Sequence, residues 1–539
     1  MNMTPVYAFI AFIPILFCVI AMIGLNWPAK YALPATWLMA CVSGLIFWHM
    51  SIVSIGAYSI AGLLNAIDVL ITVTGAILVM NTLKQSGAMT SINKGFRSIS
   101  KDSRIQAIII GFMFVSFIEA AAGFGTPSAL AAPLLVSLGF APLAAACVTL
   151  ICDSVSVCFG AIGTPVTQAI ACLGPEIANE AFIERFTMWS AIPQALAIMV
   201  LPFIVVCVLC LHFTESKSLK PAFEVLPFSL FTSLFFAVPY VLVTKFMGYD
   251  FPSIIASLCG LAAAVVCAKT GFLVPKNLFS FKTVEEEKET EEKSMSLVKA
   301  WTPYILITLL LVATRIPALG LKSLLTSDPF VVKIASVFGV ANTGYTLKWA
   351  YLPGMFFILI GVLTFIMHKM NGEQIKNVFT ATYKQVSGAF ITIVFGLAFV
   401  QILRFSGSNS MMDDSMKSMI FYMAEILSKT GRGLYTVLSP VIGVLGSFIS
   451  GSNTVSNTLF TNLQYQAATN LGFDGAYFVA FQNVGGSIGN IICINNIVAA
   501  CATLGISGQE GKIIKINFPP TLIYLVIVIL IFIFPLYIL

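Results

Sequence analysis

The sequence predicts an all-α polytopic membrane protein with about 12–14 hydrophobic segments, and three observations support this prediction. Hydrophobic residues make up 58% of the 539 residues and charged residues only 10%, whereas soluble proteins carry about 25% charged residues. Apolar stretches of roughly 20 residues, the length that crosses the hydrocarbon of a bilayer, recur along the whole chain. A similar order of features appears in both halves, so we expect two structural repeats.

The first hydrophobic segment, near residues 5–25, has neither a basic stretch before it nor a small-residue cleavage site after it. We therefore expect a retained first span rather than a signal peptide. Several segments contain Gly, Pro or polar interruptions, so the number of complete crossings can differ from the number of segments by about two or three. The segments lie near residues 5–25, 33–52, 57–82, 105–118, 142–165, 190–211, 226–246, 252–272, 301–319, 350–367, 387–403, 433–449, 475–498 and 518–538.

Residues 276–298 form a strongly polar stretch in which glutamates alternate with lysines. Such a run of charges is typical of a solvated segment. We expect it to be a linker between an N-terminal membrane half, residues 1–275, and a C-terminal membrane half, residues 299–539. A regulatory or partner-binding segment is the alternative interpretation.

Corresponding sequences identify the repeats in these halves. Leu83-Lys-Gln-Ser-Gly87 recurs as Leu403-Arg-Phe-Ser-Gly407, each at the end of an apolar segment. Residues 84–104 carry an excess of basic residues, which predicts a cytoplasmic location. The equivalent residues 404–432 carry mixed charges, which is compatible with the opposite face of the membrane. The repeats are therefore expected to be inverted.

Each half contains an apolar hairpin with a polar, glycine-rich tip, at residues 105–140 and 433–473. The arms of both hairpins are shorter than the roughly 20 residues that span a bilayer, so we predict that the hairpins are re-entrant. A helix with a polar break follows each hairpin, at residues 141–170 and 474–500. Irregular backbone at membrane depth is tolerated only where protein or a water-filled cavity surrounds it. We therefore expect the two tips and the two breaks to converge on a binding site.

The tips, residues 117–127 and 450–458, and the breaks carry the residues expected to bind a substrate. Hydroxyls and amides can donate to a carboxylate or coordinate a cation, half-helix N-termini attract anions, and glycines allow close backbone approach. A helix-packing seam is the alternative interpretation of the small residues. The expected substrate-binding residues are Gly123, Gly125, Thr126, Ser154, Ser156, Ser452, Asn453, Thr454, Ser456, Asn457, Asn483 and Asn495.

Three acidic residues lie within apolar segments: Glu119 beside the first tip, Asp153 at the first helix break, and Asp68. Ionisable groups within a bilayer are costly and mark functional sites. Burial favours the neutral form of a carboxylic acid, which can then exchange a proton near neutral pH. We expect Glu119 and Asp153 to couple transport to protons. The alternative is that each acid is neutral and caps a broken helix.

The remaining polar residues indicate no chemistry. Arg315 can neutralise a carboxylate, but an arginine near a helix end more often reaches the membrane interface. His49, His212 and His368 fall near span ends, and the Cys207–Cys210 pair lies in a membrane helix without ligand partners. Because the sequence shows no catalytic set, metal-ligand spacing or Walker A motif, we expect no enzyme activity, cofactor or metal ion. The net charge of +6 is spread over loops and does not indicate a nucleic-acid partner.

At these motifs the sequence resembles the L-lactate permease family of bacterial carriers. The resemblance covers nearly the whole chain and is carried by residues 117–127, 159–163, 450–457 and 489–493. It implies proton-coupled symport of 2-hydroxymonocarboxylates such as L-lactate and glycolate through the cytoplasmic (inner) membrane of a bacterium. One departure stands at Ile494-Asn495, where members often carry Pro-His or Pro-Gln.

The second tip also resembles that of the divalent anion/sodium symporters, which are dimers that move a transport domain against a scaffold in the manner of an elevator. This resemblance raises a sodium-coupled carrier of another small organic anion as the alternative function, and makes a homodimer plausible. The expected mechanism places the carboxylate between the tips at Ser452, Asn453 and Thr454. The 2-hydroxyl is expected to meet the helix breaks, and its candidate partners are Ser154, Ser156 and Asn483. A channel remains a weaker alternative, favoured if Glu119 proved dispensable for flux.

Overall fold

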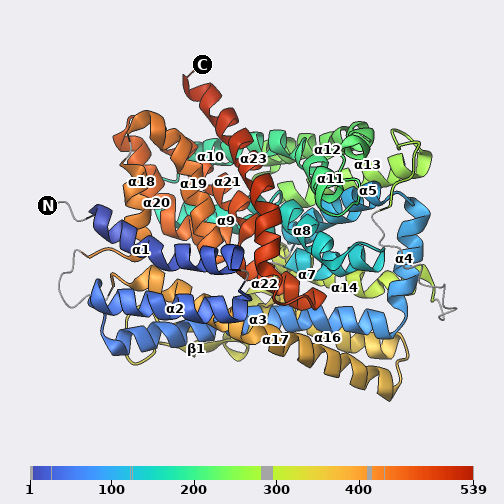
Figure 1. The fold of residues 1–539 in the computed structure, drawn as a ribbon, viewed down its shortest axis with the longest axis horizontal. Coiled ribbons are helices and arrows are strands. Elements are labelled where there is room, and N and C mark those ends of the chain that lie inside the picture. Colours follow the sequence, from blue (N-terminus) through green and yellow to red (C-terminus); the bar gives the residue numbers. More distant parts are fainter. Residues whose placement is uncertain are drawn as a thin grey trace.

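The computed structural model describes residues 4–25, 27–121, 123, 126–280, 295–408, 416–429 and 431–537. The described chain is almost entirely helical (Figure 1). The strands within it are β1 (Val332–Ile334) and β2 (Tyr345–Leu347), which form an antiparallel pair. The predicted all-α class is therefore confirmed.

The first part of the chain forms α1 (Thr4–Val19), η1 (Ile20–Gly24), α2 (Ala29–Ile46), α3 (Ile52–Gln85), α4 (Ala88–Ile99), α5 (Ser103–Gln106), η2 (Ala107–Phe114), α6 (Val115–Ala121), α7 (Thr126–Ser137), α8 (Pro142–Asp153), η3 (Val157–Phe159), α9 (Gly160–Leu173), α10 (Glu180–Ile198), α11 (Leu201–His212), α12 (Lys220–Met247) and α13 (Pro252–Thr270). The second part forms α14 (Leu297–Arg315), η4 (Pro317–Leu319), α15 (Leu321–Leu325), η5 (Asp328–Phe330), η6 (Trp349–Tyr351), α16 (Pro353–Met367), α17 (Gly372–Phe405), α18 (Met419–Ser428), α19 (Arg432–Ser450), α20 (Asn453–Asn470), α21 (Gly475–Gly489), η7 (Asn490–Ile492), α22 (Ile494–Leu504) and α23 (Glu510–Tyr537).

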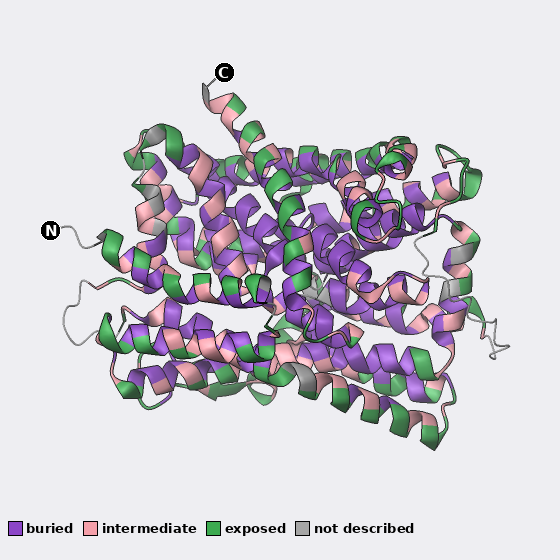
Figure 2. Cartoon of the chain, viewed as in Figure 1, coloured by how far each residue is buried: buried purple, intermediate pink, exposed green. Residues whose placement is uncertain are grey.

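Within the described residues, 11 helices are long and apolar enough to cross a membrane, or up to 13 if each of two bent pairs is one span. Large apolar side chains are exposed on the outer helices, for example Phe246 (74%) and Ile366 (75%). Figure 2 shows buried residues at the centre of the molecule and exposed residues on outer helices such as α16 and α17. Outward-facing apolar side chains are what a lipid environment requires, so the polytopic membrane prediction is confirmed.

The equivalent helices α3 and α17 are both 34 residues long and pack against each other, with α2 and α16 beside them (Figure 1). Gly62 lies against Ala398, whereas Asn81 near the other end of α3 donates to Thr382 Oγ1 (3.1 Å) and Gln385 Oε1 (3.2 Å). Residue numbers therefore rise along one helix as they fall along the other, and the pair is antiparallel. Antiparallel packing of equivalent helices agrees with inverted repeats.

The hairpin of each half packs against the broken helix of the other half. The second arm of the second hairpin, α20, contacts α9 from the first broken helix, and α7 from the first hairpin contacts α22 from the second broken helix. Each repeat thus contributes to the surroundings of the other. This crossed packing brings segments about 300 residues apart in sequence to the centre of the molecule.

The hairpin arms are longer than the sequence suggested. The first hairpin begins with a continuous helical segment, Ser103–Ala121, of 19 residues, and α19 of the second hairpin also has 19 residues. Both first arms are long enough to cross a membrane by length and composition, whereas α7 has only 12 residues. The arm-length argument for re-entrant hairpins is therefore weaker than expected, because polar residues such as Arg104, Glu119 and Arg432 continue these helices beyond their apolar parts.

Candidate functional site

A cavity of about 330 Å³ lies where the two tips and the two helix breaks meet. Its walls come from the end of α6, the start of α9, the start of α20 and the beginning of η7. The residues that line it are Glu119, Gly123, Val157, Gly160, Ala161, Pro165, Gly451, Ser452, Asn453, Thr454 and Asn490.

The first tip contributes Gly123, whose left-handed backbone (φ +65°) turns the chain at the end of α6. The Gly123 N–H donates to Glu119 O (3.0 Å), and a Cβ at this position would lie 2.9 Å from the Cβ of Ala161. Glycine is therefore required both by the turn and by the close approach of α9. The predicted residue Gly125 and the side chain of Thr126 lie outside the described part of the chain, so their roles stay predictions.

The first helix break contains strained backbone. Ala161 (φ 44°), Ile162 (φ 51°) and Gly163 (φ 66°) all have left-handed conformations inside α9. This region is unfavourable for residues with a Cβ, above all for β-branched ones, and such strain concentrates at functional sites. The turn presents Gly160 and Ala161 to the cavity.

Two buried carboxyl groups lie at this break, Glu119 (4% exposed) and Asp153 (1% exposed), within hydrogen-bonding reach of each other. A Cβ at Gly160 would lie 2.6 Å from Glu119 Oε1, so glycine makes room for this carboxyl group. Asn490 Nδ2 donates to Asp153 Oδ2 (3.3 Å), while Glu119 Oε2 and Asp153 Oδ1 have no donor among the described residues. Neighbouring buried carboxyl groups are an arrangement that can hold and release a proton.

The second tip presents a helix N-terminus to the cavity. Gly451 (φ +81°) ends α19, and α20 begins two residues later at Asn453. The first N–H groups of a helix lack intrahelical partners and carry a partial positive charge. The Ser452 side chain forms no capping hydrogen bond, so it does not occupy this end of α20. A helix end of this kind can accept an anion.

Behind the second tip, three asparagines form a buried network centred on Asn483. Asn453 Nδ2 and Asn457 Nδ2 each donate to Asn483 Oδ1 (3.0 Å), and Asn483 Nδ2 donates to Ser190 Oγ (3.2 Å). Asn457 Nδ2 also donates to Pro165 O (3.0 Å) in α9, which ties the second tip to the first helix break. Asn457 and Asn483 therefore position Asn453 and α9 rather than line the cavity.

The other predicted residues divide between cavity and support. Ser452, Asn453 and Thr454 line the cavity, whereas Ser456 is buried behind it, where its hydroxyl donates to Gly443 O (3.0 Å) and accepts from Gln482 Nε2 (2.8 Å). Ser154 donates to Ile151 O (2.6 Å). The two remaining positions behave differently: the Ser156 hydroxyl is buried and has no partner among described residues, and Asn495 lines a neighbouring cavity.

Six residues that line the cavity were not among the expected site residues, and Asn490 alone of these six has a polar side chain. They are Val157, Gly160, Ala161, Pro165, Gly451 and Asn490. Asn490 follows Gly489 at the junction between α21 and η7. A polar residue directly after a glycine at a helix end is the sequence signal that could have identified it. The sequence favours Asn483 instead, because residues 482 and 483 both carry side-chain amides. The break itself, at η7, lies within the broken helix expected at residues 474–500.

The other polar residues considered in the sequence analysis, outside the tips and breaks, make structural contacts or have no ligand partners. Tyr345 OH donates to Asp68 Oδ1 (2.6 Å), which joins β2 to the middle of α3 away from the cavity. The His368 ring contacts Ser86 Oγ (2.9 Å) and Lys299 O (3.1 Å) at the end of α16. Cys207 and Cys210 are free thiols, and no group of His, Cys, Asp or Glu in the described chain is arranged to hold a metal ion. The side chain of Arg315 lies outside the described part.

Comparison with known proteins gives a consistent result over almost the whole length. A family model described as L-lactate permease matches residues 7–539. A putative L-lactate permease of Haemophilus influenzae is 31% identical over 533 residues, which cover 95% of each chain. An L-lactate permease of Escherichia coli (strain K12) is 29% identical over 96% of this chain and 94% of its own. An L-lactate permease of Bacillus subtilis (strain 168) is 29% identical over 85% of this chain and 83% of its own.

Proposed function

The chain belongs to the L-lactate permease family, and from this premise we propose that it is a proton-coupled symporter of L-lactate and related 2-hydroxymonocarboxylates such as glycolate. Its relatives are permeases, which places the chain among membrane transporters and not among enzymes. The observation that carries the proton-coupled part of the proposal is that one cavity is lined both by Glu119, whose carboxyl group reaches the buried Asp153, and by the N-terminus of α20. These are the two groups that a proton and an organic anion need.

The carboxylate of the substrate binds at the start of α20. There it accepts hydrogen bonds from free backbone N–H groups and from the side chains of Ser452 and Thr454, both of which line the cavity. Asn453 is held by Asn483 and forms the floor of this site. A monocarboxylate fits because one helix end supplies one partial positive charge.

The proton binds at Glu119 and Asp153. Binding of the anion next to this pair favours its protonated form, and release of the proton favours release of the anion, so the two ligands move together. One proton and one monoanion carry no net charge. The membrane potential, worth about 2.3 kcal/mol per charge per 100 mV, then neither drives nor opposes transport.

We further propose that the transporter works by elevator-type alternating access in the cytoplasmic membrane of a bacterium, with lipid around it and a homodimer as its assembly. In this proposal the hairpins and broken helices move together against the layer formed by α2, α3, α16 and α17. The asparagine network supports such a unit, because it ties α20 and α21 to α9 and α10 through hydrogen bonds.

A sodium-coupled carrier of another organic anion is the second candidate, and one observation favours it. Asn453 Oδ1, Asn457 Oδ1 and Asn490 Oδ1 are buried oxygens without hydrogen-bond donors among the described residues. Hard cations bind to side-chain oxygens of this kind. These oxygens lie in or behind the same cavity, so a cation there would act on the same anion site.

Uptake of labelled L-lactate into proteoliposomes that contain the purified protein separates the two candidates. We expect uptake to follow an imposed pH gradient, acidic outside, in sodium-free buffer, and unlabelled glycolate to compete. Uptake that requires a sodium gradient and does not depend on the pH gradient would show that sodium, and not the proton, is the coupling ion. No uptake of either acid under any gradient would refute the proton-coupled symporter and leave only the carrier of another organic anion.

A further inference from the structure

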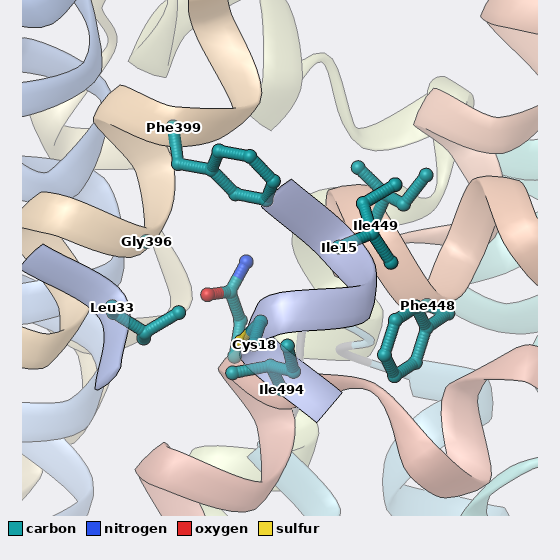
Figure 3. A pocket seen from close by; sticks show the side chains of 9 residues that line it. Ile15, Cys18, Leu33, Gly396, Phe399, Phe448, Ile449 and Ile494 are labelled. Atoms are coloured by element: carbon teal, nitrogen blue, oxygen red, sulfur yellow. The ribbon is translucent and has the colours of Figure 1, made fainter. Parts of the chain in front are cut away.

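A second, narrow cavity lies beside the tip cavity, between α1, α2, α17, α19 and α22. Hydrocarbon side chains line it, among them Phe399 from α17 and Phe448 and Ile449 from α19 (Figure 3). Neither the proposed proton site nor the proposed carboxylate site uses this space. Its lining residues are Ile15, Cys18, Leu33, Gly396, Phe399, Phe448, Ile449, Ile494 and Asn495.

Asn495 separates the two cavities. Its Nδ2 lies 2.7 Å from the position of a Cβ built on Gly451, which lines the tip cavity, and its Oδ1 lies 3.0 Å from the corresponding position at Gly396. The amide thus fills the space between two glycines on different helices. Asn495 is partly accessible, and its side chain has no hydrogen-bond partner in the described part of the chain. An amide placed without a partner against an apolar wall is costly unless a ligand completes its bonds.

We propose that Asn495 and the apolar cavity behind it form the specificity pocket for the alkyl substituent of a 2-hydroxymonocarboxylate. The inference rests on the proposed function, because it takes the carboxylate to lie at the start of α20. From that position Gly451 and then Asn495 are the nearest boundary toward the apolar space. A carboxylate cannot leave its donors for a hydrocarbon wall, so the apolar end of the molecule is the part that enters.

The size of the pocket sets the expected selectivity. Each buried methylene is worth about 0.8 kcal/mol, which is about fourfold in affinity. Glycolate has no substituent, lactate has a methyl group, and 2-hydroxybutanoate and 2-hydroxypentanoate carry longer chains, which need more room than the narrow cavity offers while Asn495 is in place. Gly396 controls this depth, since a Cβ there would approach both Asn495 Oδ1 (3.0 Å) and Leu33 Cδ1 (3.4 Å).

The test is competition by these four acids against labelled lactate uptake in proteoliposomes, compared by the ratio of their inhibition constants. Asn495→Ala removes the partition, and we expect it to shift the ratio of 2-hydroxypentanoate to glycolate by at least about fourfold toward the longer acid. Gly396→Ala narrows the pocket, and we expect a shift of similar size in the opposite direction. Gly56→Ala in α3, where a Cβ meets nothing within 4 Å, serves as the matched control and should leave the ratio unchanged.

The ratio of inhibition constants is insensitive to poor folding of a variant. A smaller amount of folded protein lowers total uptake but leaves the inhibition constants of all four acids unchanged. Equal ratios in the wild type and in both variants would overturn the inference while lactate transport itself persists. A lipid acyl chain found in the purified protein by mass spectrometry and lost in the Gly396→Ala variant would also overturn it. If the wild type transports neither lactate nor glycolate, the proposed function fails, and that outcome is distinct from unchanged ratios.

Discussion

Glu119 illustrates how one residue combines burial, contact and access. Its carboxyl group is only 4% exposed, lies against the backbone of Gly160 and reaches Asp153, yet it lines the cavity that the substrate is proposed to enter. A structural cap would satisfy both of its oxygens, but Oε2 has no donor among the described residues. The free oxygen is what a proton carrier needs.

Glu119→Gln is the sharpest test of proton coupling. Glutamine has the same shape but cannot release a proton, so we expect uptake driven by a pH gradient to fall by at least about tenfold, or 1.4 kcal/mol. Exchange of labelled for unlabelled lactate at equal pH should persist, since it needs no net proton movement. Glu510→Gln is the control, because Glu510 is buried too but accepts from the Gly508 N–H (2.9 Å) outside the cavity. Undiminished gradient-driven uptake in Glu119→Gln would contradict the assignment.

Asn483 offers a second test at this scale, as the shared acceptor of two buried amides. Asn483→Ala leaves the N–H groups of Asn453 and Asn457 without this acceptor, which costs about 1–3 kcal/mol. We expect a lower thermal midpoint in detergent and weaker lactate binding together. Asn462→Ala removes an exposed amide that donates to Cys172 O (3.0 Å) and should change the midpoint little. Equal midpoints for the two variants would show that the network does not hold the tip.

At the scale of elements, the left-handed turn in α9 is the feature that shapes the cavity. It stops the helix at the level of Glu119 and directs Gly160 and Ala161 toward the substrate. The loop after α12 packs onto it, since a Cβ at Gly163 would lie 2.7 Å from Tyr249 Cδ2 and 2.8 Å from Tyr249 O. The turn is thus packed from outside by Tyr249, in addition to the hydrogen bond that Thr164 Oγ1 donates to Ala161 O (2.6 Å) within it.

Gly163→Ala tests this support. The added methyl group meets both an unfavourable backbone conformation and the main chain of Tyr249, so we expect destabilisation of about 1–3 kcal/mol and a loss of uptake. Gly271→Ala at the end of α13 is the matched control, because Gly271 has a similar backbone (φ 75°, ψ 10°) but nothing within 4 Å of the added Cβ. The difference in thermal midpoint between the two variants isolates the contact with Tyr249. A larger loss in Gly271→Ala would refute this account.

The contact between α3 and α17 is the second feature at this scale. A Cβ at Gly62 would overlap the backbone of Ala398, whereas Gly56, two turns earlier in α3, has open space around it. We expect Gly62→Ala to lower stability by about 1–3 kcal/mol, and Gly56→Ala to raise it by up to about 1 kcal/mol through its helix propensity. Denaturation midpoints in one detergent compare the two. A rise in the denaturation midpoints of both variants would mean that α3 and α17 accommodate the added methyl group without loss of stability.

For the whole molecule, the antiparallel pairing of α3 with α17 and the crossed packing of hairpins with broken helices agree with two repeats related by inversion. The sidedness of the repeats follows from this arrangement. If they are inverted, the ends of α4 and α18 lie on opposite faces of the membrane.

Single cysteines at Ser98 and Lys429, both exposed, test that prediction in a chain whose 12 cysteines have been replaced. We expect a membrane-impermeant thiol reagent to label Lys429→Cys in intact cells and Ser98→Cys only in inside-out vesicles, because basic residues around Ser98 favour the cytoplasm. A permeant reagent applied to both samples checks that each cysteine reacts. Labelling of both positions from one side would rule out inversion.

The sequence by itself determined the membrane class, the approximate spans, the two hairpins and the acidic pair, because these follow from composition, segment length and the cost of polar groups in lipid. Only the tertiary structure decided which polar side chains face a ligand. Asn453 and Asn457 look alike in the sequence, yet Asn453 lines the cavity and Asn457 bonds to Pro165 O from the other repeat. The same holds for Asn490 and Asn495, whose neighbours are Asp153 and Gly396. A hydrogen bond depends on the position of its partner, and these partners come from helices far away in the chain.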